Sequence, residues 1–141
     1  MAEHATEFRL NMIHRILALG QPRYSSPLKS FVSDDSFVPE HIVRDLGPTP
    51  QEHSGFELAG PRAKLFFDPA RTRAGIVTCG GLCPGLNNVI RSLFNELHHA
   101  YGVQEVLGFR GGYPGLDPAH GQAPIRLTAE GVDGIHRRGG R

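Results

Sequence analysis

The stretch Arg73-Ala-Gly-Ile-Val-Thr-Cys-Gly-Gly-Leu-Cys-Pro-Gly-Leu-Asn87 decides the fold, because it predicts a strand, a glycine turn and the start of a helix. Residues 75–78 are apolar and partly β-branched, as in a buried strand. The paired glycines Gly80 and Gly81 then allow positive φ and leave no Cβ in the way of a ligand. A helix that begins after such a turn directs free N–H groups and its positive dipole end toward the turn. This arrangement suits a phosphate, although glycines also end strands where no ligand binds.

The residues that follow predict a βαβ unit. A helix carries six apolar residues on one face and ends at Gly102; these are Val89, Ile90, Leu93, Phe94, Leu97 and Tyr101. Residues 104–109 then predict a second buried strand, parallel to the first. Ligands in such sheets bind beyond the carboxyl ends of the strands, so we expect Gly80, Gly81 and Tyr113 along one edge. Tyr113 would either contact a nucleotide or simply pack in its turn.

Two well-known phosphate motifs are absent from this loop. No Gly-Lys-Ser/Thr follows it, so it is not a Walker A loop. Its spacing is G-G-x-x-x-G rather than G-x-G-x-x-G, and the second strand ends in Gly108-Phe-Arg-Gly111, with no acidic residue to hold a ribose. An NAD-type Rossmann module is therefore the weaker alternative.

Three motifs in order resemble the 6-phosphofructokinase family. They are Thr78-Cys-Gly-Gly-Leu-Cys-Pro-Gly-Leu-Asn87, Gly108-Phe-Arg-Gly-Gly-Tyr-Pro-Gly-Leu116 and Ile135-His-Arg-Arg-Gly-Gly140. The sequence Cys-Gly-Gly-Leu-Cys-Pro-Gly is similar to that of the plant-type, long-chain branch. The upstream pieces Phe37–Val43 and Gly60–Phe67 resemble the amino-terminal extension of that branch.

The resemblance implies phosphoryl transfer from ATP to fructose 6-phosphate, with Gly80, Gly81 and Tyr113 near the nucleotide. Pyrophosphate is the alternative donor. Family members are much longer, and the Gly-Gly-Asp loop that holds Mg²⁺ and the Thr-Ile-Asp segment with the catalytic aspartate would lie past Arg141. We therefore assign no catalytic or metal residue in this chain and expect the isolated 141 residues to be inactive, as a noncatalytic fragment would be. Arg91 matches an effector-site arginine of the short bacterial enzymes, or is plain solvated surface.

The residues before the decisive stretch predict a helix followed by an irregular arm. Phe8, Met12, Ile16 and Leu19 have helical spacing, which predicts an amphipathic helix over residues 3–19. Recurrent prolines over residues 21–62 predict an extended arm with short elements, with an exposed loop at 45–60. Residues 63–68 predict a strand whose partner the sequence leaves open. The expected domains are therefore 1–62, helix and arm, and 63–141, a partial Rossmann-like parallel sheet that begins the phosphofructokinase catalytic domain.

Composition excludes several classes of protein. The net charge of +1 gives no nucleic-acid or membrane signal, and no stretch of about twenty apolar residues would span a bilayer. No signal-peptide layout is present, so we expect a cytoplasmic location and, at full length, a homo-oligomer. The two cysteines, Cys79 and Cys83, are a weak metal or redox pair, and we expect small, partly buried residues beside a tight turn.

Overall fold

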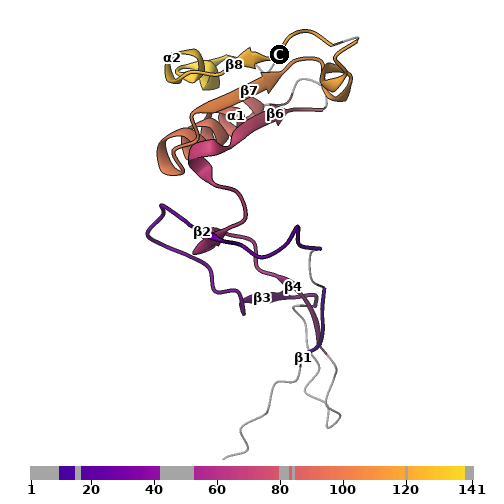
Figure 1. The fold of residues 1–141 in the computed structure, drawn as a ribbon. Helices are drawn as coiled ribbons and strands as arrows, with labels where there is room; N and C mark the ends of the chain where they lie inside the picture. The colour runs from indigo at the N-terminus through magenta and orange to yellow at the C-terminus, as the bar shows by residue number, and fades with distance from the viewer. Residues whose placement is uncertain are drawn as a thin grey trace, which may run out of the picture.

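The computed structural model describes residues 10–14, 17–41, 53–79, 83, 85–119 and 121–138. Within these ranges the chain forms two parts, which Figure 1 shows one above the other. The amino-terminal residues form an arm of short strands. Residues from Arg73 onward form an α/β unit, joined to the arm by a short connection.

The α/β unit is built on a parallel pair of strands. Strand β6 (Arg73–Val77) leads through helix α1 (Leu86–Asn95) to strand β7 (Glu105–Phe109). The two strands are parallel, in a register that runs from Arg73 opposite Glu105 to Val77 opposite Phe109. A short strand β8 (Ile125–Arg126) pairs antiparallel with β7, and helix α2 (Ala129–Val132) follows it. The prediction of a mixed α/β fold with a parallel sheet is confirmed.

The core lies between this sheet and α1. Its buried members come from strands, helices and the connection before β7: Ile76, Phe94, Val103, Val106 and Val132. Of the predicted helix face, Ile90, Phe94, Leu97 and Tyr101 pack in or against this core. Val89 and Leu93, predicted on the same helical face, are 53% and 45% exposed and lie at its solvent-facing margin. Each precedes a core residue by one position, which turns its side chain about 100° away from the sheet.

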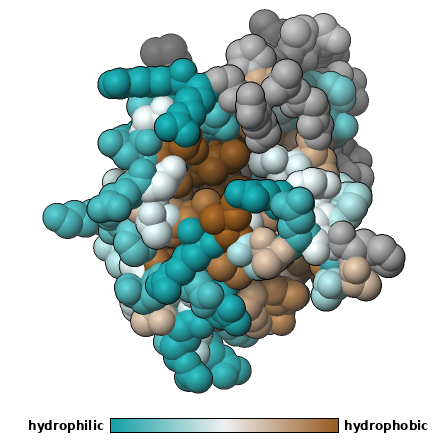
Figure 2. Space-filling view, turned by 90° about the horizontal axis from the view of Figure 1, so that it is seen from above, coloured by the Kyte–Doolittle hydropathy of each residue, from teal (hydrophilic) through white to brown (hydrophobic). Residues whose placement is uncertain are grey.

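Part of the apolar surface of the unit stays open to solvent. Figure 2 shows apolar side chains gathered at the centre of the face seen from above, with hydrophilic residues around them. Leu116, within the connection from β7 to β8, and Ile125, the first residue of β8, are 45% and 38% exposed.

Helix α1 ends through a wider turn than an α-helix has. It continues into a π-helical turn η2 (Glu96–Ala100), in which the amide of Tyr101 donates to the Glu96 carbonyl at 3.0 Å. The predicted stop at Gly102 is confirmed, since this glycine has a φ of +76°. A ring nitrogen of His98 then lies 2.9 Å from the carbonyl oxygen of Val103. This contact ties the end of the helix to the connection that leads into β7.

The arm contains two small sheets. Strands β1 (Leu10–His14), β4 (His53–Glu57) and β3 (Phe37–Pro39) form one sheet in the order β1-β4-β3, with β1 parallel and β3 antiparallel to β4. Strands β2 (Tyr24–Ser25) and β5 (Lys64–Leu65) form the other. An extended arm with short elements is what the prolines predicted.

Two predictions for the arm are wrong. Residues 10–14 form strand β1 rather than part of a helix over 3–19, and residues 17–19 also lie outside any helix; residues 3–9, 15 and 16 lie outside the described part. A short apolar run fits either period, and pairing with β4 decides for the strand. The loop expected at 45–60 contains strand β4, paired on both sides, while 45–52 are not described. Strand β5 pairs with β2 and not with β6.

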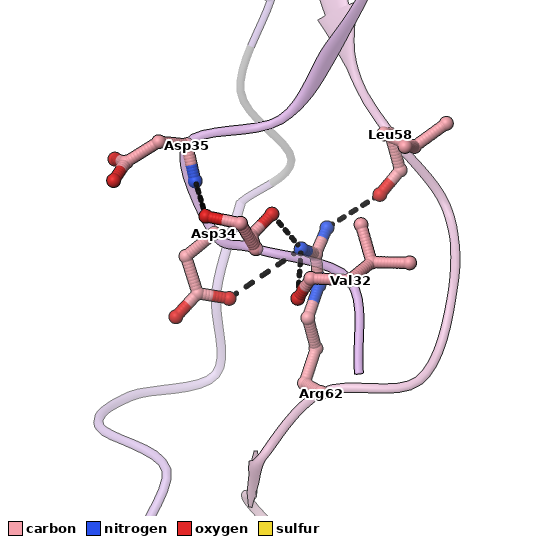
Figure 3. A network of polar contacts seen from close by, with 6 residues as sticks. Val32, Asp34, Asp35, Leu58 and Arg62 are labelled. Carbon is pink, nitrogen blue, oxygen red and sulfur yellow. Dashed lines mark hydrogen bonds and ion pairs between the residues drawn. The ribbon is translucent and has the colours of Figure 1, made fainter. Parts of the chain in front are cut away.

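Arg62 holds two turns of the arm together, as Figure 3 shows. Its guanidinium donates to the carbonyl oxygens of Ser33 at 2.7 Å, Val32 at 3.3 Å and Leu58. The carboxylate of Asp34 lies 3.5 Å away. The backbone repeats the same connection, because the Val32 amide donates to Pro61 at 2.8 Å and the Leu58 amide to Ser36 at 3.0 Å. The planar fork of arginine can satisfy several carbonyl groups at once, which the single ammonium of lysine cannot.

We therefore predict that Arg62→Lys opens this part of the arm locally. Loss of charge-assisted bonds to carbonyl groups costs about 1–2 kcal/mol, so amide exchange at Val32 and Leu58 should accelerate roughly 5- to 30-fold. The exposed Arg23→Lys is the matched control, and core amides of the α/β unit should keep their rates. Unchanged exchange at both amides in Arg62→Lys would contradict the assignment.

Candidate functional site

The structure describes the residues on both sides of the glycine loop. Thr78 and Cys79 follow the end of β6, and Cys83 and Gly85 precede α1. The candidate residues Gly80 and Gly81, with Leu82 and Pro84, lie outside the described residues. The position of the paired glycines relative to Tyr113 therefore stays a prediction, and the site is described from its surroundings.

The start of α1 is set by a glycine. Gly85 precedes the helix with φ +93° and ψ −12°, a left-handed conformation that glycine adopts without strain. A Cβ there would meet nothing within 4 Å, so the backbone angle and not lack of space selects glycine. The amide of Val89 donates to the Gly85 carbonyl at 3.0 Å, which closes the first turn. Gly85 has no side chain to cap the helix, and the amide of Leu86 donates to the Cys83 carbonyl at 3.2 Å, an acceptor outside the helix.

The loop after β7 touches the loop after β6. Gly112 has φ +68° and ψ −147°, and a Cβ on it would lie 3.3 Å from Cys79 Sγ and 3.4 Å from the carbonyl oxygen of Thr78. A side chain at this position would require its neighbours at the end of β6 to shift by a few tenths of an ångström. The two strand ends are therefore adjacent, and the segment before Gly80 lies beside the turn that carries Tyr113.

Tyr113 is presented to solvent from a tight turn. It begins the 3₁₀ turn η3 (Tyr113–Leu116) and is 69% exposed, so it does not pack within its own turn. The backbone below it is compact: Gly115 is buried, and a Cβ there would come within 1.8 Å of the Arg110 carbonyl oxygen. The turn therefore holds an aromatic face and a hydroxyl at the carboxyl edge of the sheet.

A third segment reaches this edge through Asn87, a contact that sequence reasoning missed. The Asn87 side-chain amide donates to the carbonyl oxygens of Ile135 and Arg138, both at 3.0 Å. Ile135 begins the 3₁₀ turn η4 (Ile135–Arg137), which exposes the side chains of His136 and Arg137, and Arg138 follows it, also exposed. The third motif thus meets the first at the start of α1, and the second motif meets the first at Thr78 and Cys79. The asparagine in the first motif was the available signal, since its side chain bonds well to backbone groups.

The strongest electrostatic perturbations lie away from these loops. Arg73 and Glu105 face each other at the opposite end of the parallel pair, with N···O distances of 2.6 and 3.0 Å. The hydrogen bond and the charge of Glu105 raise the pKa of Arg73. Burial, with a smaller effect of Glu96, raises the pKa of Tyr101. These groups stabilise the sheet and the helix end rather than prepare a reaction at the candidate site.

A pocket of about 340 Å³ lies between α1 and α2. Its polar lining includes Arg91, Asn95, His99, Glu130 and Asp133. The Nε of Arg91 is buried and has no hydrogen-bond partner among the described residues, while a terminal nitrogen lies 3.8 Å from Asp133. Arg91 is therefore a half-buried pocket residue and not plain solvated surface.

The described residues offer no metal centre and no disulfide. Within the ranges that the structure covers, no three His, Cys, Asp or Glu side chains gather closely enough to hold an ion. Cys79 and Cys83 are both exposed, so the expectation of partial burial is wrong; Cys79 lies where the chain leaves β6, and Cys83 lies shortly before α1. Among the same residues, no helix has the length and apolar character to cross a bilayer.

The fold and these loops define an α/β domain with glycine-rich turns at the carboxyl edge of a parallel strand pair. Residues 73–141, just under half of the chain, match the phosphofructokinase family model. An "ATP-dependent 6-phosphofructokinase" from Amycolatopsis methanolica is 46% identical over 140 residues, 89% of this chain and 30% of that protein.

Other relatives carry similar names. The Entamoeba histolytica "ATP-dependent 6-phosphofructokinase" is 54% identical over 106 residues, covering 74% of this chain and 22% of the relative. "ATP-dependent 6-phosphofructokinase 7" of Arabidopsis thaliana is 44% identical over 119 residues, 84% of this chain and 24% of the relative. The chain thus spans less than a third of these relatives. They come from different kinds of organism, so the plant-type branch stays a prediction.

The close approach of the two strand ends predicts different effects at neighbouring glycines. Gly111 and Gly112 both have positive φ, so alanine costs about 1 kcal/mol or more at either, but only Gly112 has neighbours within 4 Å. Gly112→Ala should therefore destabilise further, by roughly 1–2 kcal/mol in urea denaturation, and change the alkylation rate of Cys79 in a Cys83→Ser background. Equal alkylation rates in the Gly111→Ala and Gly112→Ala variants would argue against the contact.

Proposed function

We propose that this chain forms the first part of the nucleotide site of an ATP-dependent 6-phosphofructokinase. The observation that carries the proposal is the adjacency of the loops after β6 and β7, which Gly112 reports through Thr78 and Cys79. The names of the relatives support ATP as the phosphoryl donor. Pyrophosphate is the alternative donor for the same loops, and a noncatalytic fragment is the alternative for the chain.

In this proposal the residues of the chain bind and orient the nucleotide. The backbone N–H groups of Gly80, Gly81 and the first turn of α1 donate to phosphate oxygens, which the positive end of the helix favours. Tyr113 offers its ring or hydroxyl to the nucleotide from the neighbouring turn. Glycine at positions 80 and 81 lets the phosphates approach the backbone closely.

The reaction proposed for the whole protein transfers a phosphoryl group to the 1-hydroxyl of fructose 6-phosphate. Catalysis of such a transfer consists mainly of positioning and neutralisation of charge. The described residues do not fit Mg²⁺, since no cluster of three possible ligands occurs among them, so we propose that its ligands and the general base belong to other parts of the protein.

We also propose a domain organisation for this chain. Residues 63–141 begin a Rossmann-like catalytic domain, and residues 1–62 form an amino-terminal segment. The start of the family match at Arg73 supports a division in this region, although strand β5 pairs with β2 across the proposed boundary. We also propose a cytoplasmic homo-oligomer of the plant-type branch. The alternative NAD module is disfavoured by β7, which leads into Arg110 and glycines rather than an acidic residue.

Isothermal titration of the folded chain with ATP tests the site. Tyr113→Ala should weaken ATP binding about 5- to 10-fold, the value of one aromatic contact to a base, without loss of stability, because the side chain is 69% exposed. Tyr24→Ala, which removes a 42% exposed tyrosine of the arm, should leave the affinity unchanged. Absence of ATP binding by the folded chain would reject the site.

The isolated chain should show no kinase activity. A coupled assay for fructose 1,6-bisphosphate with the purified 141-residue protein tests this, with a longer relative as the positive control. Product formation above the enzyme-free rate would contradict this prediction, because it would mean that this chain itself contains the magnesium ligands and the general base.

A further inference from the structure

One face of α1 forms a polar contact with the segment after β8. Asn87, Arg91 and Asn95 are spaced by four residues, so they lie above one another on the helix. Arg91 and Asn95 line the pocket shared with α2, and Arg91 approaches Asp133. Asn87 is the residue of this row closest to the glycine loop, and it reaches furthest along the chain, to Ile135 and Arg138.

The two bonds of Asn87 use one nitrogen with two hydrogens. Nδ2 lies 3.0 Å from each carbonyl oxygen, so each N–H has one acceptor. The acceptors are three residues apart and enclose turn η4. A single side chain therefore fixes both ends of this turn against the first turn of α1.

Packing holds this segment at one end only. Ile135 packs against the core, but His136, Arg137 and Arg138 are exposed. The internal bonds of the turn run from Arg137 to Gly134 and from Arg138 to Ile135, both 3.0 Å, and these do not tie the segment to α1. The bond from Asn87 to the Arg138 carbonyl supplies that link just before Gly139 and Gly140, the glycines of the third motif.

We infer that Asn87 is a positioning residue that holds the segment Ile135–Arg138 in register with the start of α1. The functional consequence rests on the proposed function. In it, Asn87 keeps the third motif at a fixed distance from the phosphates that the first motif binds. The cationic side chains of the segment are thereby held near the polyphosphate, and order gained before binding lowers the entropy that binding costs.

A purely structural role would give a different result. If Asn87 served only global stability, its loss would lower the unfolding midpoint and affect amides throughout the α/β unit. If it positions the segment, the loss of order is confined to residues 135–138. Local order and global stability are separable observables.

The experiment compares Asn87→Asp with Asn88→Asp in the 141-residue chain. Aspartate keeps the size of asparagine but loses both donors and faces two carbonyl oxygens. Asn88 is exposed on the same helix turn, so its aspartate variant reproduces the added charge and its interaction with the helix dipole. Asn87→Ser, which is neutral and keeps one donor, should be intermediate and replaces Asn87→Asp if that variant does not fold.

Backbone ¹⁵N order parameters are the first measurement. Residues 135–138 should be ordered in the wild type and in Asn88→Asp, at about 0.85, and fall below about 0.6 in Asn87→Asp, while Val103 and Val106 stay unchanged. Unchanged order in residues 135–138 of Asn87→Asp, or an equal loss throughout the core, overturns the positioning role.

ATP titration of the same proteins is the second measurement. Asn87→Asp should weaken binding about tenfold or more and Asn88→Asp less than threefold; equal weakening by the two variants overturns the link to the nucleotide. A wild type that binds no ATP rejects the proposed function, and the order parameters still decide the role of Asn87.

Discussion

The parallel register of β6 and β7 is the constraint on which the candidate site depends. Parallel pairing requires a crossover, which α1 supplies, and it places the two carboxyl ends at the same edge. Val77 lies opposite Phe109, so the chain leaves both strands at the same level and Gly112 comes against Thr78 and Cys79. A shift of β6 against β7 by one residue would turn either Ile76 or Val106 out of the core, so burial fixes this register.

Helix α1 has three faces in different surroundings, and this explains its composition. One face packs Ile90 and Phe94 on the sheet, a second presents Asn87 and Arg91 to the segment after β8, and the third leaves Leu93 half exposed. Buried apolar contacts fix the axis of the helix, while directional hydrogen bonds from Asn87 hold residues 135–138 at its first turn. Both are needed if separate loops are to contact one ligand.

The sequence predicts the βαβ unit well because its signals are local. Alternating burial in β6, the glycine before α1 and the stop at Gly102 follow from residue types and spacing. Strand β1 was mispredicted because five residues fit both a helical and an extended period, and the partner strand lies some forty residues further on. The role of Asn87 was equally hidden, since its acceptors are backbone carbonyl groups 48 and 51 residues away, which no side-chain pattern reveals.

The sheet face away from α1 indicates how the unit relates to a larger domain. Gly75, Val77, Leu107 and Phe109 share that face by register, and the Phe109 ring lies over Gly75, where a Cβ would come within 2.9 Å. Val77, Leu107 and Phe109 are only half-buried, although parallel sheets are covered on both faces. The chain spans less than a third of these relatives, and an exposed apolar face of this kind suits packing against a further segment.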